Sequence, residues 1–283
     1  MEDSMKESVK LITFIYIVFI VLLAVSGSVD GIISEIVYFA AFLVPTFIAY
    51  RGSLELKRRR EEIAGVAEPP NRLFSIERGS VGLILPLIAP MIAVVFGAAY
   101  LTSLLLTSLG FASDAAPTSS LVEMLIFSAL IPALLEEIMF RYLPIKLLHP
   151  YSPRWCILLS SLYFALTHNS FFKMPYAFLA GIIFMTVDVI FDSVWPSIAM
   201  HLLNNVASIV WMKYCTSSVP IWIFISILTT LVVISMVFVI KNRKEYKRLI
   251  KEKCKKGEAF PLTWTPIALI VITVFLAVEN LFG

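Results

Sequence analysis

The chain has 283 residues, of which 59% are apolar and only 15% are charged. Soluble domains are about 45–50% apolar and about 25% charged, so this composition excludes an ordinary soluble domain and predicts an integral membrane protein. The net charge is a modest +3, and the three cysteines (Cys156, Cys215 and Cys254) have neither metal-ligand nor disulfide spacing.

Apolar runs bounded by turn signals predict an all-α, polytopic bundle of about eight to nine membrane helices, since each needs about 20 residues to cross a bilayer. The mixed charge of MEDSMKESVK favours a retained first helix over a signal peptide. The chain divides into N-terminal membrane helices (1–117), central core helices (118–212) and C-terminal membrane helices (213–283). The predicted segments lie near residues 10–26, 31–50, 80–109, 120–148, 153–169, 175–192, 194–213, 219–240 and 264–281.

Two basic stretches, both expected to be loops, predict the orientation. RGSLELKRRREEIAG follows the second predicted span, and KNRKEYKRLIKEKCKKGE follows the eighth. Both come after an even number of spans, so the positive-inside rule places them and the N-terminus in the cytoplasm. Binding of anionic lipid is the alternative role for these stretches.

A few polar residues lie inside the apolar segments. Charged groups within a membrane are costly and usually serve a function, although a buried Glu–Arg pair can also be a simple lock between helices. These residues are Glu136, Glu137 and Arg141 in the fourth segment, His168 at the end of the fifth, and His201 and Asn205 in the seventh.

Helical spacing separates the two glutamates. Glu137 lies four residues before Arg141, the favourable order for an ion pair on one helix face. Glu136 is turned about 100° from Glu137 and can point elsewhere. Asp188 and Asp192 are also four apart, and we expect them to reach water near the cytoplasmic end of their helix in a structural role.

Depth in the membrane gives a structural condition for a shared site. His168 lies about 21 Å into its helix at 1.5 Å per residue. Glu136 reaches a similar depth, about 18 Å, only if the fourth helix continues past Phe140 to about Leu148. A site that contains both residues therefore requires this long helix.

Three motifs occur in order along the predicted core. They are Glu136-Glu137-x-x-x-Arg141, Phe164-x-x-x-His168 and His201-x-x-x-Asn205, and together they resemble the motifs of the CPBP intramembrane protease family. That family includes CAAX prenyl endopeptidases and bacteriocin self-immunity proteins. The resemblance spans roughly residues 118–212. Tyr142 departs from the pattern, because many members carry a small residue there, and its bulk would narrow the cavity.

The resemblance implies an intramembrane peptidase that acts on a membrane-anchored protein or peptide, such as a prenylated one, with Glu136, His168, His201 and Asn205 as its catalytic residues. Peptide hydrolysis needs a base for water, donors for the oxyanion and an acid for the leaving amine. Glu136 in apolar surroundings is suited to act as base and then as acid. His168 would hold the water, and His201 and Asn205 would donate to the oxyanion.

The other two polar residues of the first motif have a supporting role. Glu137 paired with Arg141 would fix the helix and keep the arginine from neutralising Glu136. This pair is therefore expected to support the site without taking part in the reaction.

A catalytic zinc is the competing hypothesis. Glu136, His168 and His201 are a plausible ligand set that leaves a fourth position for water. The sequence has no HExxH motif, and Asn205 is a poor zinc ligand. We therefore favour a site that uses no cofactor.

Two further classes of function stay open. A non-catalytic relative would keep the fold and act as a membrane scaffold, an immunity factor or a regulatory protein. A proton-coupled transporter would also use buried carboxylates and histidines, but the chain lacks the internal symmetry of many transporters. Besides the lipid bilayer, the expected partner is the membrane-anchored substrate, and no nucleic acid is expected.

Overall fold

The computed structural model describes residues 2–61, 73–111 and 119–254, with a few further positions between 266 and 278. Every regular element in these ranges is helical, which confirms the all-α fold class. The long helices are α1 (Glu2–Gly27), α2 (Gly31–Glu61), α3 (Val81–Ser108), α7 (Pro153–Leu166), α8 (Met174–Phe191), α9 (Trp195–Tyr214), α10 (Ser218–Lys241) and α11 (Arg243–Lys253).

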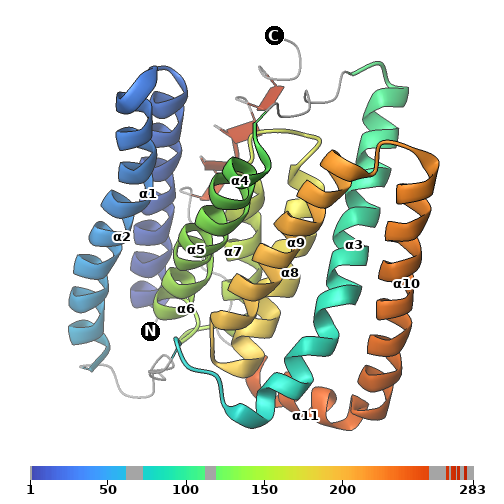
Figure 1. Ribbon diagram of the computed structural model, residues 1–283. Coiled ribbons are helices and arrows are strands. Elements are labelled where there is room, and N and C mark those ends of the chain that lie inside the picture. Colours follow the sequence, from blue (N-terminus) through green and yellow to red (C-terminus); the bar gives the residue numbers. More distant parts are fainter. Residues whose placement is uncertain are drawn as a thin grey trace.

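The helices form a bundle with two outer pairs. Figure 1 shows the α1–α2 hairpin at one edge and α3 packed with α10 at the other. Between them, α7 packs on α8, and α8 packs on α9. A helical segment formed by residues 121–147, called the rod below, contains both motif glutamates and lies among these central helices. This arrangement surrounds the glutamates with protein.

The rod is one continuous helix that contains two wider π-helical segments. It consists of α4 (Leu121–Glu123), the π segment η2 (Met124–Leu130), α5 (Ile131–Glu137), the π turn η3 (Ile138–Tyr142) and α6 (Leu143–Leu147). A capping box starts it, because Ser120 and Glu123 each bind the other's backbone N–H. The rod continues past Phe140 to Leu147, so the long fourth helix is confirmed.

Among the described residues, five helices are long and apolar enough to cross a membrane, and they identify an integral membrane protein. Every residue of α10 is at least partly exposed, as expected for a helix surrounded by lipid. The predicted count of eight to nine spans is not confirmed, and the predicted segment 264–281 lies largely outside the described residues. The five are Met5–Gly27, Gly31–Glu55, Val81–Ser108, Met174–Phe191 and Ser218–Lys241.

The two basic stretches are helical where the structure describes them, so the expectation of loops is wrong. α2 continues through the first stretch to Glu61, and α11 forms most of the second. Figure 1 shows the N-terminus, the end of α2 and α11 at the same end of the bundle. α11 is fixed there because Tyr246 donates to the carbonyl of Leu83 at 2.7 Å and Lys253 lies 2.5 Å from Asp192.

α7 and α8 approach each other closely at Gly181. A β-carbon at this position would lie 2.9 Å from the Cα atom of Ser161, which is closer than side chains pack. Small residues allow such close backbone contact between membrane helices. The contact matters for the site because α7 carries Phe164 and ends two residues before His168.

Candidate active site

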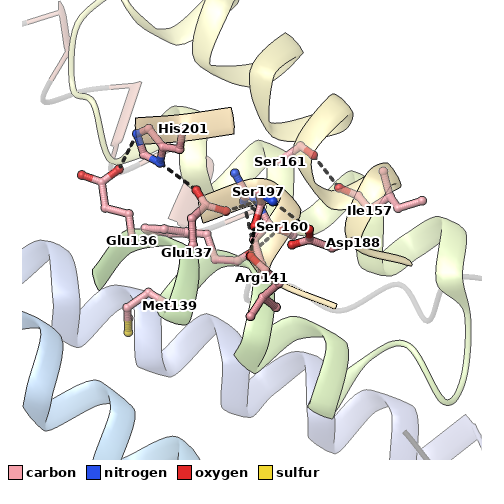
Figure 2. Close-up of polar contacts among 12 residues, drawn as sticks. Glu136, Glu137, Met139, Arg141, Ile157, Ser160, Ser161, Asp188, Ser197 and His201 are labelled. Atoms are coloured by element: carbon pink, nitrogen blue, oxygen red, sulfur yellow. Dashed lines mark hydrogen bonds and ion pairs between the residues drawn. The ribbon is translucent and has the colours of Figure 1, made fainter. Parts of the chain in front are cut away.

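Glu137 is the centre of a buried polar cluster. Its side chain is fully buried, and its Oε2 atom lies 2.9 Å from Nε of Arg141. Its Oε1 atom lies 2.8 Å from Nδ1 of His201, and Figure 2 shows both partners directed toward the carboxylate. A carboxylate can only accept, so Nδ1 of His201 donates this hydrogen bond. Glu137 thus joins the rod to α9.

Arg141 is fully buried and contacts the helices around the rod. Its Nη1 atom donates to the carbonyl of Phe140 at 3.0 Å and to the hydroxyl of Ser160 at 3.2 Å. Its guanidinium lies 4.7 Å from the ring centre of Phe164 and 5.5 Å from that of Phe184. Such cation–π contacts strengthen when they are removed from water. The arginine therefore holds the rod against α7 and α8.

The π turn η3 follows the two glutamates directly, and side chains from two other helices bind its carbonyl groups. Tyr16 of α1 donates to the carbonyl of Met139 at 3.1 Å. Ser160 of α7 donates to the carbonyl of Phe140. Hydrogen bonds in a π turn span five residues, and single π turns are frequent at functional sites. The widened turn is thus held from both sides.

Glu136 is directed away from the Glu137–Arg141 pair, as helical spacing predicts. Its side chain is 22% exposed, whereas that of Glu137 is completely buried. Its nearest ionisable partner is His201, whose Nε2 atom lies 3.9 Å from Oε2 of Glu136. Of the two adjacent glutamates, Glu136 is therefore the one that is not used in a close ion pair.

His168 is connected to the cluster through an aromatic ring. Its Nδ1 atom lies 2.9 Å from the carbonyl oxygen of Phe164, which can only accept, so Nδ1 donates. The ring of Phe164 packs edge-on against His168 at 5.0 Å and against His201 at 5.7 Å. Both histidines thus contact one phenylalanine side chain.

The four predicted catalytic residues are only partly brought together. Glu136 and His201 face each other, and Asn205 lies one turn after His201 on α9 with a partly exposed side chain. Within the described part of the chain, no hydrogen bond or ion pair connects His168 or Asn205 to Glu136 or His201. Direct convergence is therefore seen for two of the four.

Asp188 is part of the same buried region, and the expectation that it reaches water is wrong. Its side chain is fully buried, and its Oδ1 atom accepts the backbone N–H of Ser197 at 3.1 Å. Figure 2 shows Ser197 between the carboxylates of Asp188 and Glu137. Since α9 begins only four residues after α8 ends, its first turn covers Asp188. Asp192 does lie near the surface, where it pairs with Lys253.

The residues proposed as zinc ligands do not fit a metal site. Among the residues that the structure describes, no group of three or more His, Cys, Asp or Glu side chains is arranged to hold a metal ion. His201 and His168 each use Nδ1 within the protein, an arrangement also seen behind zinc ligands, so the absence of a converging group within the described ranges is the feature that argues against zinc. No step of the proposed reaction is therefore assigned to a metal.

A cavity of about 160 Å³ lies near the site but not at it. Ile20 and Leu23 of α1 line it together with Leu166 and Thr167 at the end of α7. The side chains of the four predicted catalytic residues do not line this cavity. Thr167 and Asn169, the two neighbours of His168 in the chain, also line it.

These features define a helical membrane protein with a buried cluster of Glu137, Arg141 and His201, which connects the rod to α7 and α9. Residues 118–207 match the family model of the Rce1-like type II CAAX prenyl endopeptidases. The match confirms the resemblance found in the three motifs and, because that is a family of CAAX proteases, supports a peptidase at the level of the family. No curated protein and no solved structure matches the chain significantly.

Proposed function

We propose that the chain is an intramembrane endopeptidase that hydrolyses a peptide bond of a membrane-anchored protein or peptide with water activated by Glu136. The observation that carries this proposal is the difference in burial and in partners between the adjacent glutamates. Glu137 is committed to Arg141 and His201, whereas Glu136 is partly exposed and has no close ion pair. One carboxylate is thereby left free to move a proton.

The space between Glu136 and His201 suits a nucleophilic water. The two facing atoms are 3.9 Å apart. A water at hydrogen-bond distance, about 2.8 Å, from both would make an angle of about 90° between them, which its donor and lone-pair directions allow. Glu136 accepts a proton as the water oxygen adds to the peptide carbonyl carbon. The C–N bond then breaks, and Glu136 returns the proton to the leaving amine.

His201 is suited to stabilise charge during this reaction. Its Nδ1 atom donates to Glu137, so its Nε2 atom can donate to an oxyanion when the ring is protonated. The buried carboxylate of Glu137 fixes the orientation of the ring, much as an aspartate orients the histidine of a catalytic triad. His168 completes the site by helping to hold the water when substrate is bound. Asn205 donates a hydrogen bond to the oxyanion.

The family match and the position of the site support a prenylated, membrane-anchored substrate. The cluster lies within the helical bundle, and a CAAX-type substrate is a prenylated chain terminus that is anchored in the membrane. The end of the bundle that carries the N-terminus and α11 faces the cytoplasm. Its basic residues support this orientation through the positive-inside rule.

Cleavage of a quenched fluorogenic farnesylated CAAX peptide by the full chain in liposomes tests the proposal. Glu136→Gln keeps the size of the side chain but removes its basicity. Loss of a general base typically lowers the rate by about 10²–10⁴-fold, so we expect a fall in this range with unchanged thermal stability. Glu245→Gln, at an exposed carboxylate in α11, is the matched control and should retain the wild-type rate.

Two results would contradict the proposal. Full activity of Glu136→Gln would remove Glu136 from the mechanism. Failure of the folded wild-type chain to cleave farnesylated, geranylgeranylated and unprenylated peptides would instead favour the non-catalytic scaffold, immunity or regulatory role.

A further inference from the structure

Tyr16 connects the N-terminal hairpin to the turn that follows the two glutamates. It is fully buried in α1, and its hydroxyl donates to the carbonyl of Met139 at 3.1 Å. Its ring stacks on that of Phe140, with centroids 5.0 Å apart and planes inclined by 2°. One side chain of α1 thus contacts two consecutive residues of the π turn η3.

The π turn determines how the rod residues before it are oriented relative to those after it. A π turn contains about one residue more than an α-helical turn, and one residue corresponds to a rotation of about 100° in an α-helix. If η3 relaxed to α-helical geometry, Glu137 and Arg141 would still be four residues apart on one face, but the part of the rod before the turn would rotate relative to the part after it. The contact of Glu137 with His201 on α9 and that of Arg141 with Ser160 on α7 therefore depend together on the register of this turn.

Aromatic contacts extend from Tyr16 to both histidines. Phe140, on which Tyr16 stacks, packs against Phe164 at 5.5 Å. Phe164 in turn contacts the rings of His168 and His201. A shift of the π turn would therefore be transmitted to the side chains on α7 and α9.

We propose that Tyr16 is a positioning residue of the site. Its hydroxyl holds η3 in the register in which Glu137 binds both Arg141 and His201, while Glu136 makes no close ion pair. Its catalytic consequence rests on the proposed function. α1 lies outside the matched residues 118–207, so the inference makes the N-terminal hairpin part of the active-site framework. Membrane anchoring alone would not require this contact.

Tyr16→Phe removes only the hydroxyl and keeps the stacked ring. Turnover of the farnesylated peptide by this variant should show kcat lowered on the order of tenfold with KM unchanged, because misplaced catalytic groups slow the chemical step. Thr13→Val is the matched control. Thr13 is also buried in α1, and its Oγ1 atom lies 2.8 Å from the carbonyl oxygen of Val9 and 3.0 Å from the hydroxyl of Tyr163 on α7, so its hydrogen bonds do not involve η3. It should lose similar thermal stability but keep the wild-type kcat.

A second measurement needs no activity. The chain has only three histidines, so ¹⁵N spectra of histidine-labelled protein in detergent can be assigned with His149→Gln and His168→Gln. We expect Tyr16→Phe to shift the His201 resonances and Thr13→Val to leave them in place, with His149 unchanged in both. If the wild type cleaves no peptide, the proposed function fails, but these spectra still decide the positioning role.

The inference is overturned if Tyr16→Phe keeps the wild-type His201 resonances. It is also overturned if Thr13→Val changes kcat or those resonances as much as Tyr16→Phe does. Either result would show that α1 contributes only general stability.

Discussion

Nδ1 of His201 lies 2.8 Å from Oε1 of Glu137, so the histidine of α9 is bound by the glutamate that also neutralises Arg141. The same ring presents Nε2 to Glu136 at the longer distance of 3.9 Å. One buried carboxylate therefore orients a histidine and balances a guanidinium at once. This relationship distinguishes Glu137, which has two buried partners, from Glu136, the proposed base. Substitution of Glu137 should therefore destabilise the fold more than substitution of Glu136.

Glu137→Gln is expected to destabilise the protein strongly. The variant leaves the guanidinium of Arg141 buried without its counter-charge, which typically costs about 3–5 kcal/mol. Thermal unfolding of the purified chain in detergent measures the loss. The double variant with Arg141→Met removes both charges, and it should be more stable than Glu137→Gln alone because the two sites are coupled.

The exposed pair of Glu245 and Arg248 in α11 provides a control for that experiment. Surface ion pairs contribute little because water and salt screen them, so Glu245→Gln should leave the unfolding temperature unchanged. Equal losses for Glu137→Gln and Glu245→Gln, or a double variant less stable than either single one, would show that burial does not govern the Glu137–Arg141 pair.

Local periodicity was sufficient to predict part of this site. The spacing of Glu137 and Arg141 predicts their ion pair, because residues four apart share a helix face. The depth condition on Glu136 and His168 predicts a rod that continues past Phe140. Both inferences concern one helix at a time, where 3.6 residues per turn fixes the geometry.

The remaining features depend on contacts between helices, which periodicity does not contain. The packing of α9 on the rod determines that Nδ1 of His201 binds Glu137 and not Glu136. The burial of Asp188 follows from the first turn of α9 folding over it. No local signal indicates this burial, because Asp188 lies inside α8, seven residues before α9 begins. The π turn has no periodic signature in the sequence.

Asp188→Ala is expected to disturb α9 more than Asp188→Asn. The alanine variant leaves the N–H of Ser197 buried without its acceptor, and an unsatisfied group of this kind costs about 1–3 kcal/mol. The asparagine side chain keeps an oxygen acceptor at the same place. Thermal unfolding should therefore rank the wild type and Asp188→Asn above Asp188→Ala. Indistinguishable unfolding temperatures for the two variants would mean that the Ser197 hydrogen bond contributes nothing.

Gly181→Ala is expected to destabilise the packing of α7 on α8. The added methyl group would lie 2.9 Å from the Cα atom of Ser161, and relief of such overpacking typically costs about 1–3 kcal/mol. Gly97→Ala in α3 is the matched control, because a β-carbon there meets nothing within 4 Å. It should be neutral or slightly stabilising, as expected when alanine replaces a helical glycine. The same change in unfolding temperature for both variants would rule out a tight contact at Gly181.

Removal of metal ions is expected to leave peptide cleavage intact. A catalytic zinc would need Glu136, His168 and His201 as ligands, but both histidines use Nδ1 for hydrogen bonds within the protein. Nδ1 bonds of this kind also occur behind true zinc ligands, so the decisive feature is that the three side chains do not converge. Metal analysis of active protein, before and after treatment with 1,10-phenanthroline, measures both metal content and rate. Stoichiometric zinc, with activity lost on chelation and restored by added Zn²⁺, would replace the glutamate-based reaction by a metal-assisted one.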